Sequence, residues 1–268
     1  MANVFDLDAY LGRIEYTGPR TPTYETLAGI LAAHVANIPF EVFDVLLGRP
    51  IRLDPEGLHA KIVTARRGGH CVEHGTLMCA ALHAIGFKPV RHSGRVLLFA
   101  PRHESARSHM FLSVTIDGAA YVVDPGFGLF ACALPIPVNG TPVPISAPTH
   151  RLIREGDNWV LCVTRNGGET RAWISTMEEE YPVDFEMIQN YFVTHPTSFY
   201  AHNVVASAFT KEGFVNIVNE YASVIRPGAA QAVHLADRKA LRLFVAQHFG
   251  FDLPELEKMK VDSVPGWL

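Results

Sequence analysis

At residues 66–75 the chain reads Arg66-Arg67-Gly68-Gly69-His70-Cys71-Val72-Glu73-His74-Gly75. Behind the glycine pair, apolar residues recur at helical spacing, and Gly86 ends the pattern; they are Val72, Leu77, Met78, Ala81, Leu82 and Ile85. This spacing predicts a helix that begins near Gly68-Gly69 and carries Cys71 in or near its first turn. Unpaired backbone N–H groups and the positive end of the helix dipole lie there, and both stabilise a thiolate.

Two interpretations of Cys71 are open on this evidence. A buried, unreactive thiol is the commoner fate of a cysteine. Glycine, arginine and histidine neighbours are not typical of an apolar slot, and we expect Arg66 and Arg67 to add positive charge near the sulfur. These neighbours favour a reactive thiol.

A thiol nucleophile needs a base and a group that orients the base. Residues 108–116 predict a strand whose second half alternates between polar and apolar, and Asp117-Gly118 predicts a hairpin turn into a returning strand that ends at Asp124. In that register Ile116 faces Ala119, and His109 lies diagonally across from Asp124 on the same face. The hairpin therefore offers an imidazole beside a carboxylate. Separately, each residue also fits a structural role, as a half-buried strand histidine and a strand-end turn residue.

The same decapeptide supports a rival hypothesis. His70-x-x-Glu73-His74 matches the inverted zinc-peptidase motif, with two histidines one helical turn apart and a glutamate as base. The motif is short, and a histidine directly after a glycine pair would lie at a frayed helix start. We therefore expect no metal site.

The helical pattern extends back to about Asp6. A short amphipathic segment covers residues 8–14, and Thr21-Pro22 predicts an N-cap followed by proline at the first helical position. Ile38-Pro39-Phe40 ends that second helix, because proline disfavours helix in the residue before it.

From Phe87 to about Trp173 the period changes to two. Strands are expected at 95–100, 108–116, 121–124, 151–153, 159–164 and 169–174. Beyond Pro182 we expect a helix at 184–193, strands at 203–210 and 215–224, and a last helix at 237–249. The order predicts an α+β fold with three regions. These are a helical bundle (1–86) with the candidate nucleophile, an antiparallel β-barrel (87–182) with the histidine and aspartate, and an α/β region (183–268).

Composition narrows the function classes. The 268 residues carry 23 Lys+Arg against 27 Asp+Glu, a net charge of −4, so a nucleic-acid partner is not expected. Four cysteines without C-x-x-C spacing fit free thiols in a reducing compartment. The first residues are acidic, unlike a secretion signal, and the uncharged stretch 125–150 contains too many prolines for a membrane helix. A cytoplasmic location is therefore expected.

Taken together, these motifs resemble the arylamine N-acetyltransferase family. The matching stretches run in family order from near residue 6 to about residue 200. They are Tyr10-Leu11-x-Arg13-Ile14-x-Tyr16-x-Gly18, Ile38-Pro39-Phe40-Glu41, Asp44-Val45-Leu46-Leu47-Gly48-Arg49-Pro50-Ile51, Arg67-Gly68-Gly69-x-Cys71-x-Glu73-His74, Ser108-His109-Met110, Val123-Asp124-x-Gly126-Phe127-Gly128 and Thr194-His195-Pro196-x-Ser198.

The resemblance implies a helical bundle, a β-barrel and an α/β lid around a Cys-His-Asp core like that of cysteine proteases. It also implies two-step, ping-pong acetyl transfer from acetyl-CoA to an arylamine or arylhydrazine through an acetyl-cysteine. Cys71 would be the nucleophile, His109 its base and Asp124 the orienting carboxylate. By the same resemblance, Phe40 and Phe127 would line the acceptor pocket, and Ser105, Gly126 and Gly128 would lie near the pantetheine arm of the donor.

The chain departs from the family pattern at four positions. Val42 replaces the usual Asn, His70 the usual aromatic residue before the cysteine, and Val72 a usual Phe, while Pro125 interrupts the D-V-G-F-G stretch. His70 and Val72 flank the candidate nucleophile, so rate and acceptor preference are the properties they affect. The alternative functions are a thiol peptidase or a transglutaminase-like enzyme with the same triad, or a binding module in which the triad does not act.

Overall fold

The computed structural model describes residues 5–143, 148–165, 167–210 and 213–267. Helix α5 (Cys71–Ile85) is central to its helical part and begins where the glycine pair predicts. His70 is the N-cap, and the Glu73 carboxylate accepts a hydrogen bond from the His70 backbone N–H. Gly86, at φ +103°, ends the helix in the left-handed conformation that glycine adopts without strain.

Four other elements of this part pack around α5 in one apolar core: α1 (Leu7–Arg13), α2 (Tyr24–Asn37), α4 (Pro55–Leu58) and a π-helical turn, η1 (His59–Thr64). The short helix α3 (Phe43–Leu46) packs instead towards the C-terminal part of the chain. The predicted N-cap Thr21 is wrong, because α2 begins two residues later with Thr23 as its cap, whose hydroxyl accepts the Thr26 N–H at 3.3 Å. The helix ends before Pro39, as predicted.

A seven-stranded antiparallel sheet forms the middle of the chain, in the order β5-β4-β3-β2-β8-β7-β6. Its strands are β2 (Val90–Val96), β3 (Arg107–Ile116), β4 (Ala119–Val123), β5 (Ile136–Pro137), β6 (Thr149–Glu155), β7 (Asn158–Arg165) and β8 (Gly168–Ser175). The edge strands β5 and β6 approach each other, so the sheet is a nearly closed barrel. A short 3-10 turn, η2 (Gly128–Phe130), follows β4.

The first barrel strand differs from its predicted position at 95–100. Strand β2 lies earlier because Val90–Gly94 pair with β3 before Arg95 and Val96 pair with β8. The chain leaves the sheet ahead of Pro101, which has no N–H to donate to a ladder. The stretch 125–150 contains η2, β5 and the start of β6, and residues 144–147 are outside the described part.

A second, five-stranded sheet combines β1 from the N-terminal part with four strands from the last third of the chain, in the order β1-β9-β10-β11-β12. Its strands are β1 (Phe40–Glu41), β9 (Val205–Thr210), β10 (Gly213–Val218), β11 (Tyr221–Arg226) and β12 (Ala229–His234). Around it lie α6 (Pro182–Thr194), α7 (Phe199–His202), α8 (Arg238–Phe249), and the 3-10 turns η3 (Pro254–Lys258) and η4 (Pro265–Trp267). The single strand predicted at 215–224 is wrong, because Asn219, at φ +55°, turns the chain between β10 and β11.

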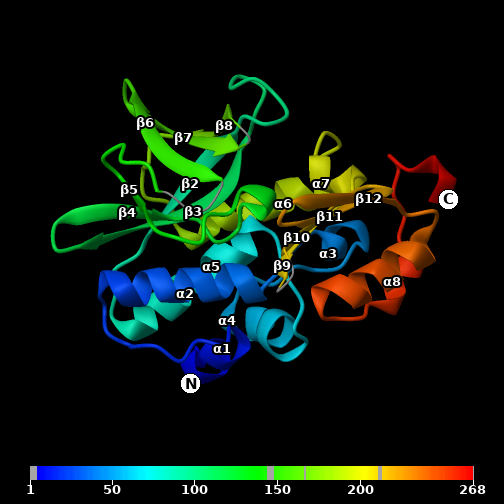
Figure 1. Cartoon of the computed structure of the whole chain (residues 1–268), viewed down its shortest axis with the longest axis horizontal. Coiled ribbons are helices and arrows are strands. Elements are labelled where there is room, and N and C mark those ends of the chain that lie inside the picture. Colours follow the sequence, from blue (N-terminus) through cyan, green and yellow to red (C-terminus); the bar gives the residue numbers. More distant parts are fainter. Residues whose placement is uncertain (1–4, 144–147, 166, 211–212, 268) are drawn as a thin grey trace.

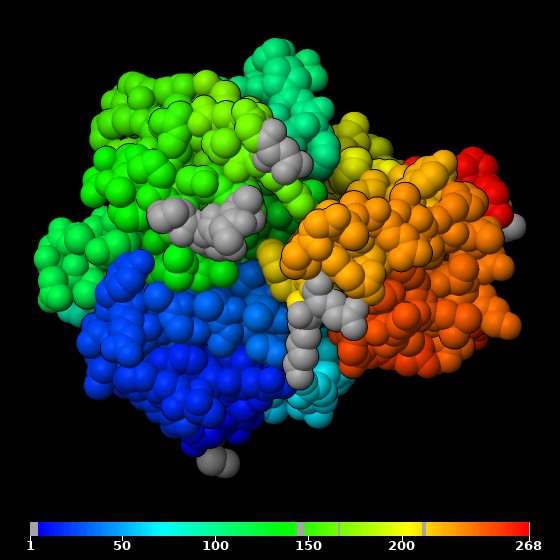
Figure 2. All heavy atoms as spheres, viewed as in Figure 1, coloured from blue at the N-terminus to red at the C-terminus, as the bar shows by residue number. Residues whose placement is uncertain are grey.

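Strand β1 joins the N-terminal part of the chain to the C-terminal sheet, since Phe40 pairs with Ser207 of β9. Figure 1 shows the barrel and the C-terminal sheet side by side above the N-terminal helices, and Figure 2 shows the same regions packed together in space-filling form. All four cysteines are free thiols, as the sequence predicts. Within the described residues, none of the helices has both the length and the apolar character that a membrane crossing requires.

Candidate active site

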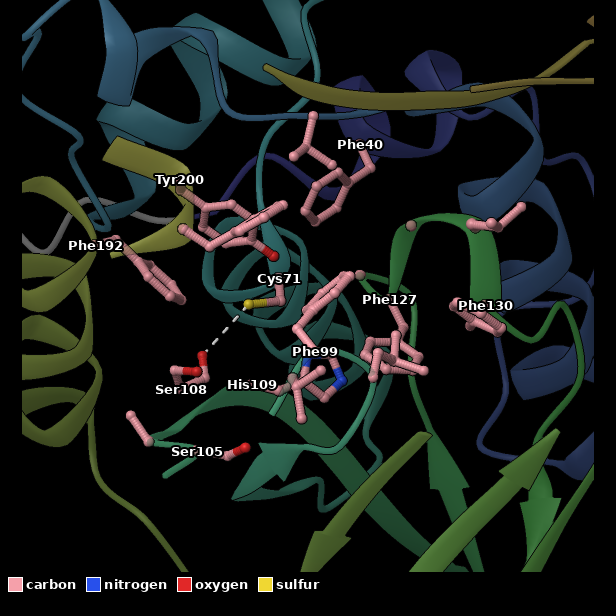
Figure 3. Close-up of a pocket in the computed structure, with 18 of the residues that line it drawn as sticks. Phe40, Cys71, Phe99, Ser105, Ser108, His109, Phe127, Phe130, Phe192 and Tyr200 are labelled. Atoms are coloured by element: carbon pink, nitrogen blue, oxygen red, sulfur yellow. Dashed lines mark hydrogen bonds between the residues drawn. The ribbon is translucent and has the colours of Figure 1, made fainter. Parts of the chain in front are cut away.

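Cys71 is the first residue of α5 and lines a cavity of about 420 Å³. The cavity lies where the start of α5, the barrel and the C-terminal region meet (Figure 3). The side chain is 2% exposed, and its thiol donates to the carbonyl oxygen of Ser108 at 3.6 Å. A helix start is rich in free backbone N–H groups, so the sulfur lies beside donors that can bind an anion.

His109 and Asp124 meet as the hairpin predicts. The register of β3 and β4 pairs Ile116 with Ala119, and His109 Nε2 donates to Asp124 Oδ2 at 2.9 Å. Both side chains are buried. Since Nε2 is held by the carboxylate, Nδ1 is the ring nitrogen left for the sulfur, and Figure 3 shows His109 beside Cys71.

The buried charges shift the pKa values of the two groups in opposite directions. Burial raises the pKa of Cys71, but hydrogen bonds and charge interactions with His109 and His70 outweigh burial and lower it to about 6. Burial lowers the pKa of His109, but the charge and hydrogen bond of Asp124 outweigh it and raise that pKa to about 10. These opposite shifts favour the thiolate–imidazolium form of the pair near neutral pH.

Trp173 is a residue at this site that the sequence interpretation missed. Its Nε1–H donates to the same Asp124 oxygen at 3.0 Å, and its ring stacks on Phe111 with centroids 4.3 Å apart. Asp124 Oδ2 therefore accepts two hydrogen bonds, which fix the carboxylate against His109. The sequence signal was a tryptophan within a predicted strand, which by itself does not identify the residue that accepts its hydrogen bond.

The residues expected to bind acceptor and donor also lie at the cavity. Phe127 has its ring centroid 4.5 Å from that of His109, and Phe40 is brought in by β1. Gly126 passes so close to α5 that a Cβ would lie 2.7 Å from Cys71 Cα, so a side chain there would collide with the helix start. Gly128 and Ser105 line the cavity as well, although the Ser105 hydroxyl donates to the carbonyl oxygens of Ala100 and Pro101.

Several other aromatic residues line the cavity without having been predicted: Phe99, Phe130, Tyr191, Phe192, Phe199 and Tyr200. Phe99, from the loop after β2, and Phe199, from α7, stack across the gap between barrel and C-terminal region, with centroids 4.9 Å apart. Together with Phe40 and Phe127 they give the cavity several aromatic walls, which suit a flat ring. The runs Tyr191-Phe192 and Phe199-Tyr200 are the sequence signal for this wall.

The expectation that Arg67 adds free positive charge near the sulfur is wrong, whereas that for Arg66 stays a prediction. Arg67 is held by two buried carboxylates, donating to Glu41 at 2.6 Å and to Asp44 at 2.7 Å. Lys61 pairs at 2.8 Å with Asp44 and with Glu73. We call Glu41, Asp44, Lys61, Arg67 and Glu73 the ion network. Arg49 also approaches Asp44, at 3.7 Å, so each cation here is held by carboxylates and away from the sulfur.

The zinc-peptidase hypothesis conflicts with the contacts of its histidines. His74 hydrogen-bonds His34 Nε2 through Nδ1 at 2.8 Å and the Pro39 carbonyl oxygen through Nε2 at 3.2 Å, so both of its ring nitrogens are engaged. Glu73 is held by Lys61 and by the backbone of His70. Among the described residues, no group of three potential ligands is arranged around a common metal position.

Comparison with known proteins places this geometry in context. A protein family described as N-acetyltransferase matches residues 23–258. The arylamine N-acetyltransferase of Mycolicibacterium smegmatis is 35% identical over 264 residues, 96% of each chain, and that of Escherichia coli is 29% identical over 93% of this chain and 90% of its own. The solved structure of Mycobacterium marinum arylamine N-acetyltransferase has a TM-score of 0.88 at 30% identity, over 94% of both chains. A structure of that protein in complex with CoA has a TM-score of 0.87, also at 30% identity over 94% of both chains.

Proposed function

Because the chain belongs to the arylamine N-acetyltransferase family of acyl-transferring enzymes, we propose that it moves the acetyl group of acetyl-CoA to arylamines and arylhydrazines in two steps through Cys71. The observation that carries the proposal is the position of Cys71 at a helix start, in an aromatic cavity, beside the His109–Asp124 pair. A thiolate held next to an imidazolium is a ready nucleophile near neutral pH.

In the first step, Cys71 Sγ attacks the carbonyl carbon of the thioester and forms the new S–C bond. Backbone N–H groups at the start of α5, that of Cys71 among them, stabilise the oxyanion, an interaction worth about 3 kcal/mol per donor. The C–S bond to CoA then breaks, and His109 gives its proton to the departing sulfur. His109 is left neutral, with Asp124 still holding Nε2.

In the second step, the amine nitrogen attacks the acetyl-cysteine while His109 Nδ1 takes its proton. The Sγ–C bond breaks, its electron pair returns to Cys71, and the thiolate–imidazolium pair is restored. An arylamine suits this step because it is largely unprotonated near neutral pH and keeps its lone pair.

The cavity walls support the choice of substrates. Phe40 and Phe127 line the same cavity as Cys71 and are proposed to hold the acceptor ring. Gly126, Gly128 and Ser105 are proposed to border the donor's pantetheine arm. The related Mycobacterium marinum structure contains CoA, which supports acetyl-CoA as donor. The C-terminal region supplies Phe192 and Tyr200 to the same cavity and is proposed to act as a lid that keeps water from the acetyl-enzyme. The division at residues 86 and 182 and the cytoplasmic location stay predictions.

The proposal is tested by mass spectrometry of the intact protein mixed with acetyl-CoA. One added acetyl group, mapped to Cys71 and discharged by aniline or an aryl hydrazide, is the expected result. The Cys79→Ala protein is the matched control, because Cys79 is a buried thiol on the same helix, and it should take up acetyl equally. Cleavage of peptides without acetyl uptake would instead favour the thiol-peptidase alternative.

Thiol reactivity should follow the low pKa of Cys71. Because the thiolate is the reactive form, alkylation by iodoacetamide should reach half its maximal rate near pH 6, whereas a free cysteine does so near pH ~8.5. Burial raises the pKa of Cys79 and that of Cys132, the latter to about 12, so these thiols should react slowly. Acetyl-CoA should protect Cys71. A midpoint above pH 8 would contradict the thiolate–imidazolium pair.

A further inference from the structure

His74 lies one helical turn after Cys71 on α5 and belongs to a buried chain of hydrogen bonds that the two-step scheme does not use. Its Nε2 lies 3.2 Å from the Pro39 carbonyl oxygen, and its Nδ1 lies 2.8 Å from His34 Nε2. His34 Nδ1 in turn lies 2.9 Å from the Tyr10 hydroxyl. All three side chains are at most 1% exposed. The chain therefore runs from the core of the helical part to the segment that enters the cavity.

The carbonyl at its end fixes the direction of every hydrogen bond in this chain. A carbonyl oxygen only accepts, so His74 Nε2 carries a hydrogen and donates it to Pro39. Burial lowers the pKa of His74 to about 4, and burial together with the charge of His74 lowers the pKa of His34, so both rings are neutral near pH 7. His74 Nδ1 then accepts from His34 Nε2–H, and His34 Nδ1 accepts from the Tyr10 O–H.

The Pro39 carbonyl lies where the chain crosses the start of α5. The Gly69 N–H also donates to this oxygen, at 3.3 Å, and the Glu41 N–H donates to the Gly69 carbonyl oxygen at 2.9 Å. Phe40 lies between these bonds, and its ring is nearly parallel to that of His74, with 6.4 Å between centroids and 14° between planes. His74 is thus bonded to the backbone directly before Phe40 and lies alongside its ring.

We propose that His74 is a positioning residue for the acceptor: by holding the Pro39 carbonyl, it holds the Phe40 ring in place. The inference rests on the proposed function, in which Phe40 holds the aromatic ring of the amine. Phe40 and Cys71 line the same cavity (Figure 3). Since His74 and Cys71 are three residues apart on α5, they share one face of the helix, and the hydrogen bond ties the Phe40 segment to the turn that carries the nucleophile.

This role predicts a change in one half of the reaction only. The amine nitrogen must lie within reach of the acetyl carbon in the second step, and that position depends on the wall against which its ring packs. Acetylation of Cys71 by acetyl-CoA does not depend on the ring. Loss of the hydrogen bond to Pro39 should therefore raise KM for aniline about tenfold and leave the single-turnover rate of Cys71 acetylation within about twofold of native.

Three substitutions of His74 separate this hydrogen bond from the rest of the core. His74→Gln keeps an N–H donor close to the position of Nε2 and should keep the native KM for aniline. His74→Asn places its amide near the position of Nδ1, so it can still pair with His34 but does not reach Pro39, and it should raise KM about tenfold. His74→Met has the length of glutamine without a donor, and it should behave as His74→Asn does. If one of these two fails to fold, the other is compared with His74→Gln.

Tyr10→Phe is the matched control for a loosened core. It removes the hydroxyl donor at the far end of the same chain and should lower the free energy of unfolding in urea, but it leaves the bond from His74 to Pro39 intact. Its KM for aniline should therefore stay native.

The inference is overturned if the folded His74→Asn or His74→Met protein keeps the native KM, if His74→Gln fails to restore it, or if Tyr10→Phe raises it as much. Failure of the proposed function looks different, because the native protein would then take no acetyl group from acetyl-CoA onto Cys71.

Discussion

Asp124→Asn is expected to lower kcat/KM for acetyl transfer by about 10³- to 10⁴-fold, the size of effect known when the carboxylate of a catalytic triad becomes an amide. Asp124 Oδ2 accepts the His109 Nε2–H and the Trp173 Nε1–H. An amide oxygen can still accept these bonds, but without a negative charge it no longer raises the pKa of His109. The pKa of Cys71 then rises, because its imidazolium partner is lost, and less thiolate is present at pH 7.

Single-turnover acetylation at pH 7, with alkylation followed against pH, measures both consequences. Asp117→Asn is the matched control, because Asp117 is exposed in the turn of the same hairpin and should leave the rate unchanged. Trp173→Phe should cost less, about tenfold, because one of two hydrogen bonds to the carboxylate is lost and its charge remains. An Asp124→Asn protein within tenfold of the native rate would show that Asp124 does not control His109.

The geometry of the His109–Asp124 pair could be predicted because it is local. A two-residue turn at Asp117-Gly118 fixes the register of the two strands, and the alternation of β3 then decides which side chains share a face. The start of α5 could be predicted for a similar reason, since a glycine pair and Gly86 bracket a helical period. Both features are set by fewer than twenty consecutive residues.

The sequence patterns of the β3–β4 hairpin and of α5 could not predict which distant residues join them at the cavity. Phe40 reaches the cavity because a two-residue strand, β1, pairs with β9 far along the chain, and so short a strand has no periodicity to detect. Trp173 reaches Asp124 across the barrel, 49 residues further along. His70 resembled half of a zinc motif until its Nδ1 proved to be the cap of α5. In each case, tertiary contacts decide which of several permitted roles a residue takes.

The ion network also depends on distant contacts, and it leads to the largest expected effect on stability. Arg67→Met is expected to lower the free energy of unfolding by about 3–5 kcal/mol, because it leaves Glu41 and Asp44 charged and short of a partner in the interior. Glu41 is 0% exposed. Urea unfolding at pH 7 measures the change. Arg52→Met is the matched control, since Arg52 pairs with exposed carboxylates and its loss should leave the unfolding curve nearly unchanged.

The direction of the pKa shift of Asp44 determines how the loss of unfolding free energy in Arg67→Met depends on pH. Burial raises the pKa of Asp44, but Lys61 and then Arg67 outweigh it, so its folded pKa lies below its unfolded value. Such a group contributes stability above the unfolded pKa of about 4, and this contribution disappears as pH falls through the folded pKa. The difference in free energy of unfolding between the native and Arg67→Met proteins should therefore become smaller below pH 4. A gap that stays constant would show that lost packing, not charge, causes it.

A second substitution tests directly whether the buried charge causes the loss. Without Arg67, Glu41 keeps only the longer contact with Lys61, at 3.9 Å. Glu41→Gln in the Arg67→Met background removes this poorly compensated charge, and the glutamine carbonyl can still accept the Phe43 N–H that Glu41 Oε2 accepts at 2.8 Å. The double variant should regain part of the lost stability, although Glu41→Gln alone destabilises the native protein by removing a partner of Arg67. Because Glu41 belongs to β1 beside Phe40, and Arg67 precedes the glycines that lead to Cys71, recovery should appear in acetyl transfer as well as in unfolding. Recovery of stability without activity would mean that the network supports the fold but does not position the cavity.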